Sequence, residues 1–136
     1  MLFSILWICA WLEYSSRFIV QVAAASYYFD SNASRDGSAS VGLGFKFAYL
    51  KHMGSLALGS FIIAVVRFIK YVFVYLSQSA SKATGENVLV QVLVKCALCY
   101  LDLLEKITDY INESAYAYMA VSGESFCTAA WHAFLL

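Results

Sequence analysis

The sequence predicts an all-α fold, part of a multi-pass transmembrane helical bundle with about three spanning helices and a short terminal interfacial helix. Charged residues make up only 13% of the 136 residues, about half of the roughly 25% usual in soluble domains. A chain this short exposes much of its surface, and it has too few polar residues to cover that surface. One membrane domain, 1–136, is therefore expected, with lipid as its solvent. Its predicted spans and loops are, in order, 2–29, 30–52 (loop), 53–76, 77–87 (loop) and 88–121.

The composition excludes several other classes of protein. Nine basic residues balance nine acidic ones, so no positive excess is available to neutralise nucleic-acid phosphates. The high apolar content excludes a disordered chain. The sequence has no phosphate-binding loop, nucleophile–base constellation or cofactor motif, which argues against an enzyme. Cys96 and Cys99 have redox or zinc spacing, but they lie in an apolar run far from both histidines. Two buried thiols are expected there rather than a metal site.

The first apolar segment, 2–29, is expected to span the bilayer. At 1.5 Å per residue it is about 40 Å long as a helix, and a hydrocarbon core is about 30 Å thick. Its only charges are Glu13 and Arg17, which are four residues apart, share a helix face and are able to pair. The segment ends in three aromatic residues, 27–29, which suit the boundary between lipid and water.

The second apolar segment, 53–76, is also expected to span. Ser55 and Gly59 lie four residues apart, as do Ser60 and Ala64. Small residues at this spacing let a neighbouring helix approach closely, which matters where lipid removes the hydrophobic force between helices. The sequence therefore predicts a helix-packing face here.

Two basic residues, Arg67 and Lys70, are the only charges in the second segment. Both lie toward its carboxyl-terminal end, where long side chains reach the lipid headgroups. We expect this headgroup position in preference to a buried functional cation.

The third segment, 88–121, is apolar overall but carries a polar stripe. At 100° per residue, Gln91 and the charged residues that follow it fall within about 60° of one line. As a helix, the stripe extends for about 33 Å, one bilayer thickness. Its members are Gln91, Lys95, Asp102, Glu105, Lys106, Asp109 and Glu113.

Two interpretations of this stripe remain open from the residues alone. A helix lying flat in the membrane interface would turn the stripe toward water. A spanning helix would turn it toward a hydrated interior, as ionisable residues inside membranes usually do. Beyond the stripe, Gly123 permits a turn, and the final apolar piece, 126–136, is too short to span.

Three sequence runs resemble the choline transporter-like family. The first is the end of the first segment, AAASYYF at 23–29. The second is KHMGSLALGSFIIA at 51–64, followed by a basic residue. The third is LEK at 104–106, with Asn112, AY at 115–116, a glycine and FCTA at 126–129. The positions that carry this resemblance, as motif or packing residues, are His52, Gly54, Ser55, Gly59, Ser60, Arg67, Asn112, Phe126 and Cys127.

The resemblance implies a multi-pass solute carrier that moves choline, or a related quaternary or primary amine, through a bundle of about ten spans. About three of those spans are expected here, so a fragment or truncated gene model is the expectation. Its implied partners are the lipid bilayer, the cationic amine, and the remaining helices of a full-length carrier or partner membrane subunits. A plasma membrane is favoured over an organelle membrane.

The polar stripe and the resemblance together suggest a substrate pathway along the third segment. A quaternary ammonium group donates no hydrogen bond, so aromatic faces and carboxylates recognise it. The pathway candidates are Asp102, Glu105, Asp109, Tyr100, Tyr110, Tyr116 and Tyr118. The competing interpretation, favoured for any single residue, is that the stripe packs in ion pairs such as Asp102–Lys106. The competing function is a non-transporting assembly subunit, or a fragment without activity of its own.

Overall fold

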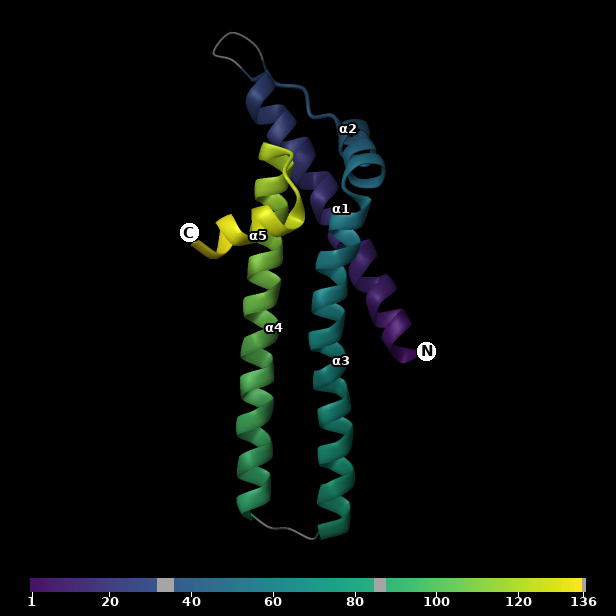
Figure 1. Cartoon of the computed structure of the whole chain (residues 1–136), viewed down its shortest axis with the longest axis vertical. Coiled ribbons are helices and arrows are strands. Elements are labelled where there is room, and N and C mark those ends of the chain that lie inside the picture. Colours follow the sequence, from purple (N-terminus) through teal and green to yellow (C-terminus); the bar gives the residue numbers. More distant parts are fainter. Residues whose placement is uncertain (32–35, 85–87, 136) are drawn as a thin grey trace.

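The computed structural model describes residues 1–31, 36–84 and 88–135, and the side chains of 80–84 lie outside that description. Every regular element in these ranges is helical, which confirms the all-α prediction (Figure 1). The elements are α1 (Leu2–Asp30), α2 (Val41–Lys46), the π-helix η1 (Phe47–Lys51), α3 (Met53–Thr84), α4 (Val88–Ser122) and α5 (Phe126–Leu135).

The two longest helices, α3 and α4, run side by side in opposite directions as a hairpin (Figure 1). Helix α1 crosses both of them at an angle and packs against each. Helix α5 turns back from the end of α4 after Gly123, whose φ of +72° needs a glycine. Helix α2 and η1 lie beside the carboxyl-terminal half of α1. The four longer helices therefore meet at one end of the hairpin.

The predicted loop at 77–87 is wrong for most of its length, because α3 continues to Thr84. No proline or glycine interrupts residues 77–84, and the alanine, lysine and glutamine among them favour a helix. Residues 85–87 of that loop lie outside the described residues. The outer bounds of α1 and α4 agree with the predicted first and third segments to within one residue.

The predicted loop at 30–52 is also partly wrong, because it contains α2 and η1. Its serines and glycines, which suggested a loop, instead cap α2 and let it pack closely against α1. The hydroxyl of Ser40 accepts a hydrogen bond from the backbone of Leu43 at 3.3 Å and so caps α2. Gly44 lies against α1, where a Cβ would be 2.7 Å from the backbone oxygen of Ile19. Residues 32–35 of this loop lie outside the described residues.

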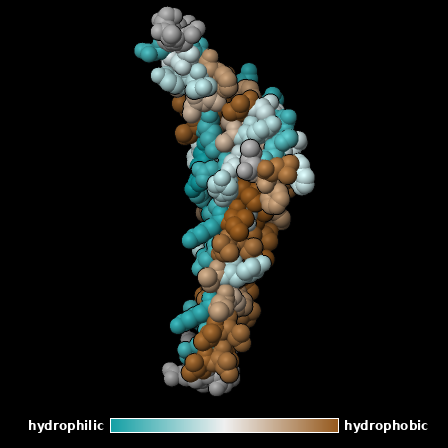
Figure 2. Space-filling view, turned by 90° about the vertical axis from the view of Figure 1, so that its left-hand side faces the viewer, coloured by the Kyte–Doolittle hydropathy of each residue, from teal (hydrophilic) through white to brown (hydrophobic). Residues whose placement is uncertain are grey.

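The core lies where α1, α3, α4 and α5 meet. Helix α1 contributes Phe18, α3 contributes Leu56 and Ile63, and α4 contributes Tyr116 and Met119, all of them buried. Away from this core, large apolar side chains cover the surface, and Figure 2 shows them beside a hydrophilic band that follows the long axis. This inverted distribution fits a membrane protein.

Two helices within the described residues are long and apolar enough to cross a bilayer, α1 and the 53–79 part of α3. Helix α4, at about 52 Å, is also long enough, but its charges exceed what such a span ordinarily carries. A third span therefore stays a prediction, as does the interfacial position of α5. The all-α membrane-bundle fold class is confirmed.

The expected burial of Cys96 and Cys99 is wrong. Both thiols are exposed. Their positions on α4 turn away from the polar stripe, and the stripe is the face that carries the contacts with α1 and α3. In lipid, such a surface suits a small apolar side chain.

Candidate functional site

The charged residues of the three long helices meet in one place, which we call the ion-pair network. It joins α1, α3 and α4 through seven ion pairs at 2.5 to 3.7 Å. Five carboxylates and three cations take part, so the network has a net charge of −2. Its members are Glu13, Arg17, Arg67, Lys70, Asp102, Glu105, Asp109 and Glu113.

Arg67 occupies the centre of the ion-pair network. Its Nε donates to Glu105 Oε1 at 3.2 Å, its Nη1 donates to Glu13 Oε2 at 3.4 Å, and its Nη2 lies 3.6 Å from Asp109 Oδ2. The Arg67 and Glu105 side chains are only 23% and 21% exposed. A planar guanidinium with five donors suits such a multiple contact. Arg67 thus connects all three helices.

Lys70 extends the network toward the far end of the hairpin. Its ammonium group lies 2.5 Å from Asp102 Oδ1 and 2.8 Å from Glu105 Oε2. The headgroup position of Arg67 and Lys70 stays a prediction, but the structure shows both side chains paired with carboxylates of α4. Because α3 continues to Thr84, both residues lie in the middle of the helix, with the carboxylates of α4 alongside. Pairing across helices also replaces the expected Asp102–Lys106 pair within α4.

The other end of the network is more open. Arg17 pairs with Glu13 at 2.9 Å, as predicted, and lies 3.7 Å from Glu113. Its guanidinium also lies over the ring of Tyr14, 5.8 Å from the centroid. The Tyr14 hydroxyl donates a hydrogen bond to Asp109. Glu113 is 57% exposed and, within the described ranges, has this one loose ion pair.

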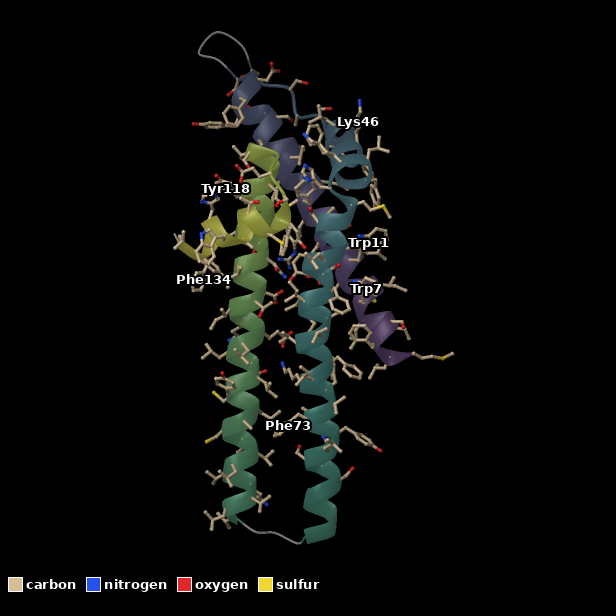
Figure 3. All side chains as sticks on the ribbon, viewed as in Figure 1. Trp7, Trp11, Lys46, Phe73, Tyr118 and Phe134 are labelled. Atoms are coloured by element: carbon tan, nitrogen blue, oxygen red, sulfur yellow. The ribbon has the colours of Figure 1, made fainter. Side chains whose placement is uncertain are left out.

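The four candidate tyrosines do not form an aromatic cage. Tyr100 and Tyr110 are exposed on other faces of α4. Tyr118 points away from α3 (Figure 3) and stacks on His132 of α5 with centroids 5.1 Å apart. Tyr116 is fully buried, and its hydroxyl donates to Leu56 O at 3.4 Å. The wheel that defined the polar stripe explains this, since it places Tyr100 and Tyr118 about 180° from Gln91.

The predicted packing face of α3 is present at Gly59 and Ser60. Asn112 donates from Nδ2 to Gly59 O at 3.1 Å, and both Asn112 and Ser60 are buried. Phe126 is also buried, close to Gly59. By contrast, a Cβ on Gly54 would meet no described atom within 4 Å. The remaining motif positions are Ser55, which is half-buried, and Cys127, which is exposed.

His52 joins η1 to α3 and is buried between aromatic rings. Its imidazole stacks on Phe47 with centroids 6.2 Å apart and meets the edge of Phe18 at 5.8 Å. Burial, with a smaller contribution from the neighbouring Lys51, lowers the pKa of His52 below its usual value. The imidazole is therefore neutral at pH 7. Its Nε2 has no hydrogen-bond partner among the described residues.

Several network residues were not among the predicted site residues. The sequence did point to Glu13, Arg17 and Lys70 as partners for α4. Each of the two apolar segments carries only two charges, and the polar stripe of α4 has more carboxylates than cations. Tyr14 had no such signal in the sequence. Within the described part of the chain, no group of three or more histidine, cysteine, aspartate or glutamate side chains is arranged to hold a metal ion.

Comparison with known proteins gives one consistent result. The model of a family described as plasma-membrane choline transporter matches residues 1–136. Choline transporter-like protein 2 of Bos taurus is 34% identical over 135 residues, which cover 98% of this chain and 19% of the relative. The human protein of the same name is 40% identical over 85 residues, covering 62% of this chain and 12% of the relative.

A third relative extends the match to another member of the group. Choline transporter-like protein 5 of Xenopus tropicalis is 39% identical over 85 residues, 62% of this chain and 12% of the relative. The chain spans at most about a fifth of the length of these curated relatives.

Proposed function

This chain belongs to the plasma-membrane choline transporter family, and from that premise we propose that it forms part of a membrane solute carrier for choline or a related organic amine. In this proposal α1, α3 and α4 all cross the bilayer, and the membrane is the plasma membrane. Helix α4 packs along the part of α3 that is long and apolar enough to cross the bilayer. This packing supports a crossing by α4 as well.

The observation that carries the proposal is the ion-pair network. Charges inside a membrane are costly, and they face a protein interior or a water-filled cavity rather than lipid. Five carboxylates against three cations leave a surplus of two negative charges. Such a surplus attracts a monovalent organic cation over several ångströms, and Lys95 and Lys106, which lie on the same stripe outside the network, weaken that attraction. The hydrophilic band beside the apolar surface in Figure 2 fits a pathway along this edge of α4.

The carboxylates divide into two roles. Asp102 and Glu113 are 51% and 57% exposed, so a cation in water can approach them. Glu105 is mostly covered by Arg67 and Lys70, and Asp109 is held by Arg67 and Tyr14. We assign attraction of the substrate to the first pair and connection of the helices to the second.

The aromatic faces for a quaternary ammonium come, in this proposal, from helices of the carrier outside this chain. Tyr100 and Tyr110 lie on faces of α4 that turn away from the ion-pair network. They therefore contribute to the substrate site only if another helix brings the pathway to them.

Uptake of radiolabelled choline tests the proposal. The assay uses a full-length relative in which this chain replaces the corresponding segment, with surface expression measured for each variant. Asp102→Asn should raise the KM for choline while expression stays normal, and Glu105→Gln should lower expression. The matched control is Glu124→Gln, which makes the same change outside the network. Unchanged uptake in Asp102→Asn, Glu105→Gln and Asp109→Asn at normal expression would refute the pathway.

A non-transporting assembly subunit is the alternative. The exposed apolar side chains of the α3–α4 hairpin favour it, because they suit packing against other membrane helices as well as lipid. Under this alternative the charge variants change complex assembly and leave the transport kinetics of the assembled protein unaltered.

A further inference from the structure

A cavity of about 260 Å³ lies between α3 and α4, toward the end of the hairpin that is far from the core (Figure 1). One residue of α3 and five of α4 line it, namely Ser77, Val90, Gln91, Val94, Lys95 and Leu98. From this lining we infer that the cavity binds an anionic phospholipid of the surrounding bilayer, with the lipid phosphate at Lys95 and an acyl chain on the apolar residues. The inference goes beyond the proposed function, from which it takes only the crossing of the bilayer by α3 and α4.

The lining residues of α4 form two rows along the helix. Val90, Val94 and Leu98 follow one another at four-residue spacing and make an apolar row about 12 Å long. Gln91 and Lys95, also four residues apart, make a shorter polar row directly beside it. The apolar row continues further from the hairpin end than the polar row does. A phospholipid has the same division, because its acyl chain continues deeper into the bilayer than its headgroup.

The cavity lies at the depth of a lipid headgroup. The part of α3 that is long and apolar enough to cross the bilayer ends at Ser79, two residues or about 3 Å beyond Ser77. Lys95 lines the same cavity as Ser77, so its long side chain reaches the level of the lipid phosphates. Figure 1 shows that this part of the hairpin extends past the amino terminus of α1, with no other described helix beside it. Lipid can therefore reach the cavity.

Within the described residues, Lys95 has no acidic side chain beside it. It is the single charged residue among 71–79 of α3 and 88–101 of α4. The next carboxylate along α4 belongs to Asp102, seven residues or about 10 Å away, and that carboxylate already lies 2.5 Å from Lys70. A cation in the membrane without a counter-charge is unfavourable. A lipid phosphate would supply the missing negative charge, and a headgroup without a cation of its own would do so best.

Hydrogen-bond donors for a phosphate are present next to this charge. Lys95 carries three N–H groups and the Gln91 amide carries two, and both side chains are exposed, so they are able to turn toward a ligand. A lysine ammonium is a common partner of phosphate in proteins. The Ser77 hydroxyl donates to Val74 O at 2.9 Å, so we assign Ser77 to the wall of the cavity and not to the phosphate.

Native mass spectrometry of the full 136-residue chain tests the inference directly. The chain is released from nanodiscs that contain equal amounts of phosphatidylglycerol and phosphatidylcholine with the same acyl chains, and the retained lipids are counted. The chain should retain phosphatidylglycerol with at least about a fivefold preference. Lys95→Gln should abolish this preference, and Lys95→Arg should keep it. Equal retention of the two lipids, or an undiminished preference in Lys95→Gln, would overturn the inference.

Two controls separate a lipid site from general attraction between the chain and an anionic membrane. Lys106→Gln removes the same charge from an exposed position of the same stripe, outside the cavity, and should keep the preference. Glycerol phosphate, which has the phosphate but no acyl chain, should not displace the lipid. An equal loss of preference in Lys106→Gln and Lys95→Gln, or displacement by glycerol phosphate, would contradict a lipid held by both its headgroup and its chain.

A full-length relative in which this chain replaces the corresponding segment tests for another occupant, a further helix of the carrier. Purified from cells, this chimeric carrier should retain an anionic phospholipid that is lost in Lys95→Gln and kept in Lys106→Gln. Identical lipid retention in the two variants would mean that a carrier helix covers the cavity, and would overturn the inference. A carrier that transports no amine but retains this lipid would refute the proposed function and leave the lipid site in place.

Discussion

Tyr116 lies directly against the backbone of Gly59, where a Cβ would be 2.8 Å from the Tyr116 Cζ atom. This contact brings α4 close to α3 and leaves Asn112 within hydrogen-bond distance of Gly59 O. Close approach of this kind is what small residues provide between membrane helices.

Gly59→Ala should destabilise the bundle by about 1–3 kcal/mol, because the added methyl group overlaps Tyr116 and Phe126. Gly54→Ala is the matched control. A Cβ there meets nothing within 4 Å in the part of the chain that the structure describes, and alanine favours a helix by up to about 1 kcal/mol over glycine. Unfolding in mixed micelles with increasing dodecyl sulfate measures both variants, and equal losses would contradict the packing described.

The Arg67–Glu105 pair should have a larger coupling energy than the Arg17–Glu113 pair. The first is mostly buried with a 3.2 Å contact, and the second is largely exposed at 3.7 Å. Double-mutant cycles with Arg67→Met and Glu105→Gln should give about 1–3 kcal/mol. The cycle for the exposed pair should give below about 1 kcal/mol. Comparable values for the two cycles would argue against Arg67 as the centre of the network.

Tyr14→Phe should cost about 1–3 kcal/mol, because Asp109 loses a partly buried hydrogen-bond donor while the ring itself is retained. Tyr28→Phe makes the same change at an exposed position of α1 and should be neutral within about 0.5 kcal/mol. The same micelle unfolding assay compares them. A neutral Tyr14→Phe variant would mean that this hydrogen bond contributes nothing to stability.

Stability should fall on acidification through His52. The folded state lowers the pKa of His52, so the unfolded chain binds a proton first as pH drops below about 6.5. His52 therefore contributes no penalty at pH 7.5, and an increasing one from about pH 6.5 downward to its folded pKa. Thermal unfolding in detergent at pH 7.5 and 5.5 should show the loss, and His52→Gln should reduce it. An identical pH response in that variant would exclude His52 as its origin.

The sequence predicted the fold well where apolar patterning alone decides it. The apolar runs gave the bounds of α1 and α4 because each stops at a cluster of polar residues or a glycine. The end of α3 was missed because serine and glutamine at 77–78 resemble a loop, whereas the helix continues through them to Thr84 with no proline or glycine to interrupt it. Helix α2 was missed because the close contact of Gly44 with Ile19 depends on tertiary structure.

The candidate site was predicted in part. The polar stripe identified the face of α4 that meets the other helices, but its partners were not evident because ion pairs across helices depend on packing rather than spacing. Arg67 and Lys70 were therefore assigned to the headgroups. The positions of Tyr100 and Tyr118 needed no structure, since the helical wheel that places Asp109 on the stripe places both opposite it. The same wheel places Tyr116 on the stripe, so its burial against Leu56 depends on packing.

Water access to α4 tests the central claim most directly. In a chain with its four native cysteines replaced, single cysteines are introduced at Lys95, Lys106, Leu93 and Leu103. All four positions are exposed in the structure, so only the surrounding solvent distinguishes them. A membrane-impermeant, charged thiol reagent should modify Lys95→Cys and Lys106→Cys readily, and Leu93→Cys and Leu103→Cys at least about tenfold more slowly. Equal rates at the four positions, or faster reaction at the leucines, would contradict a polar pathway along one face of α4.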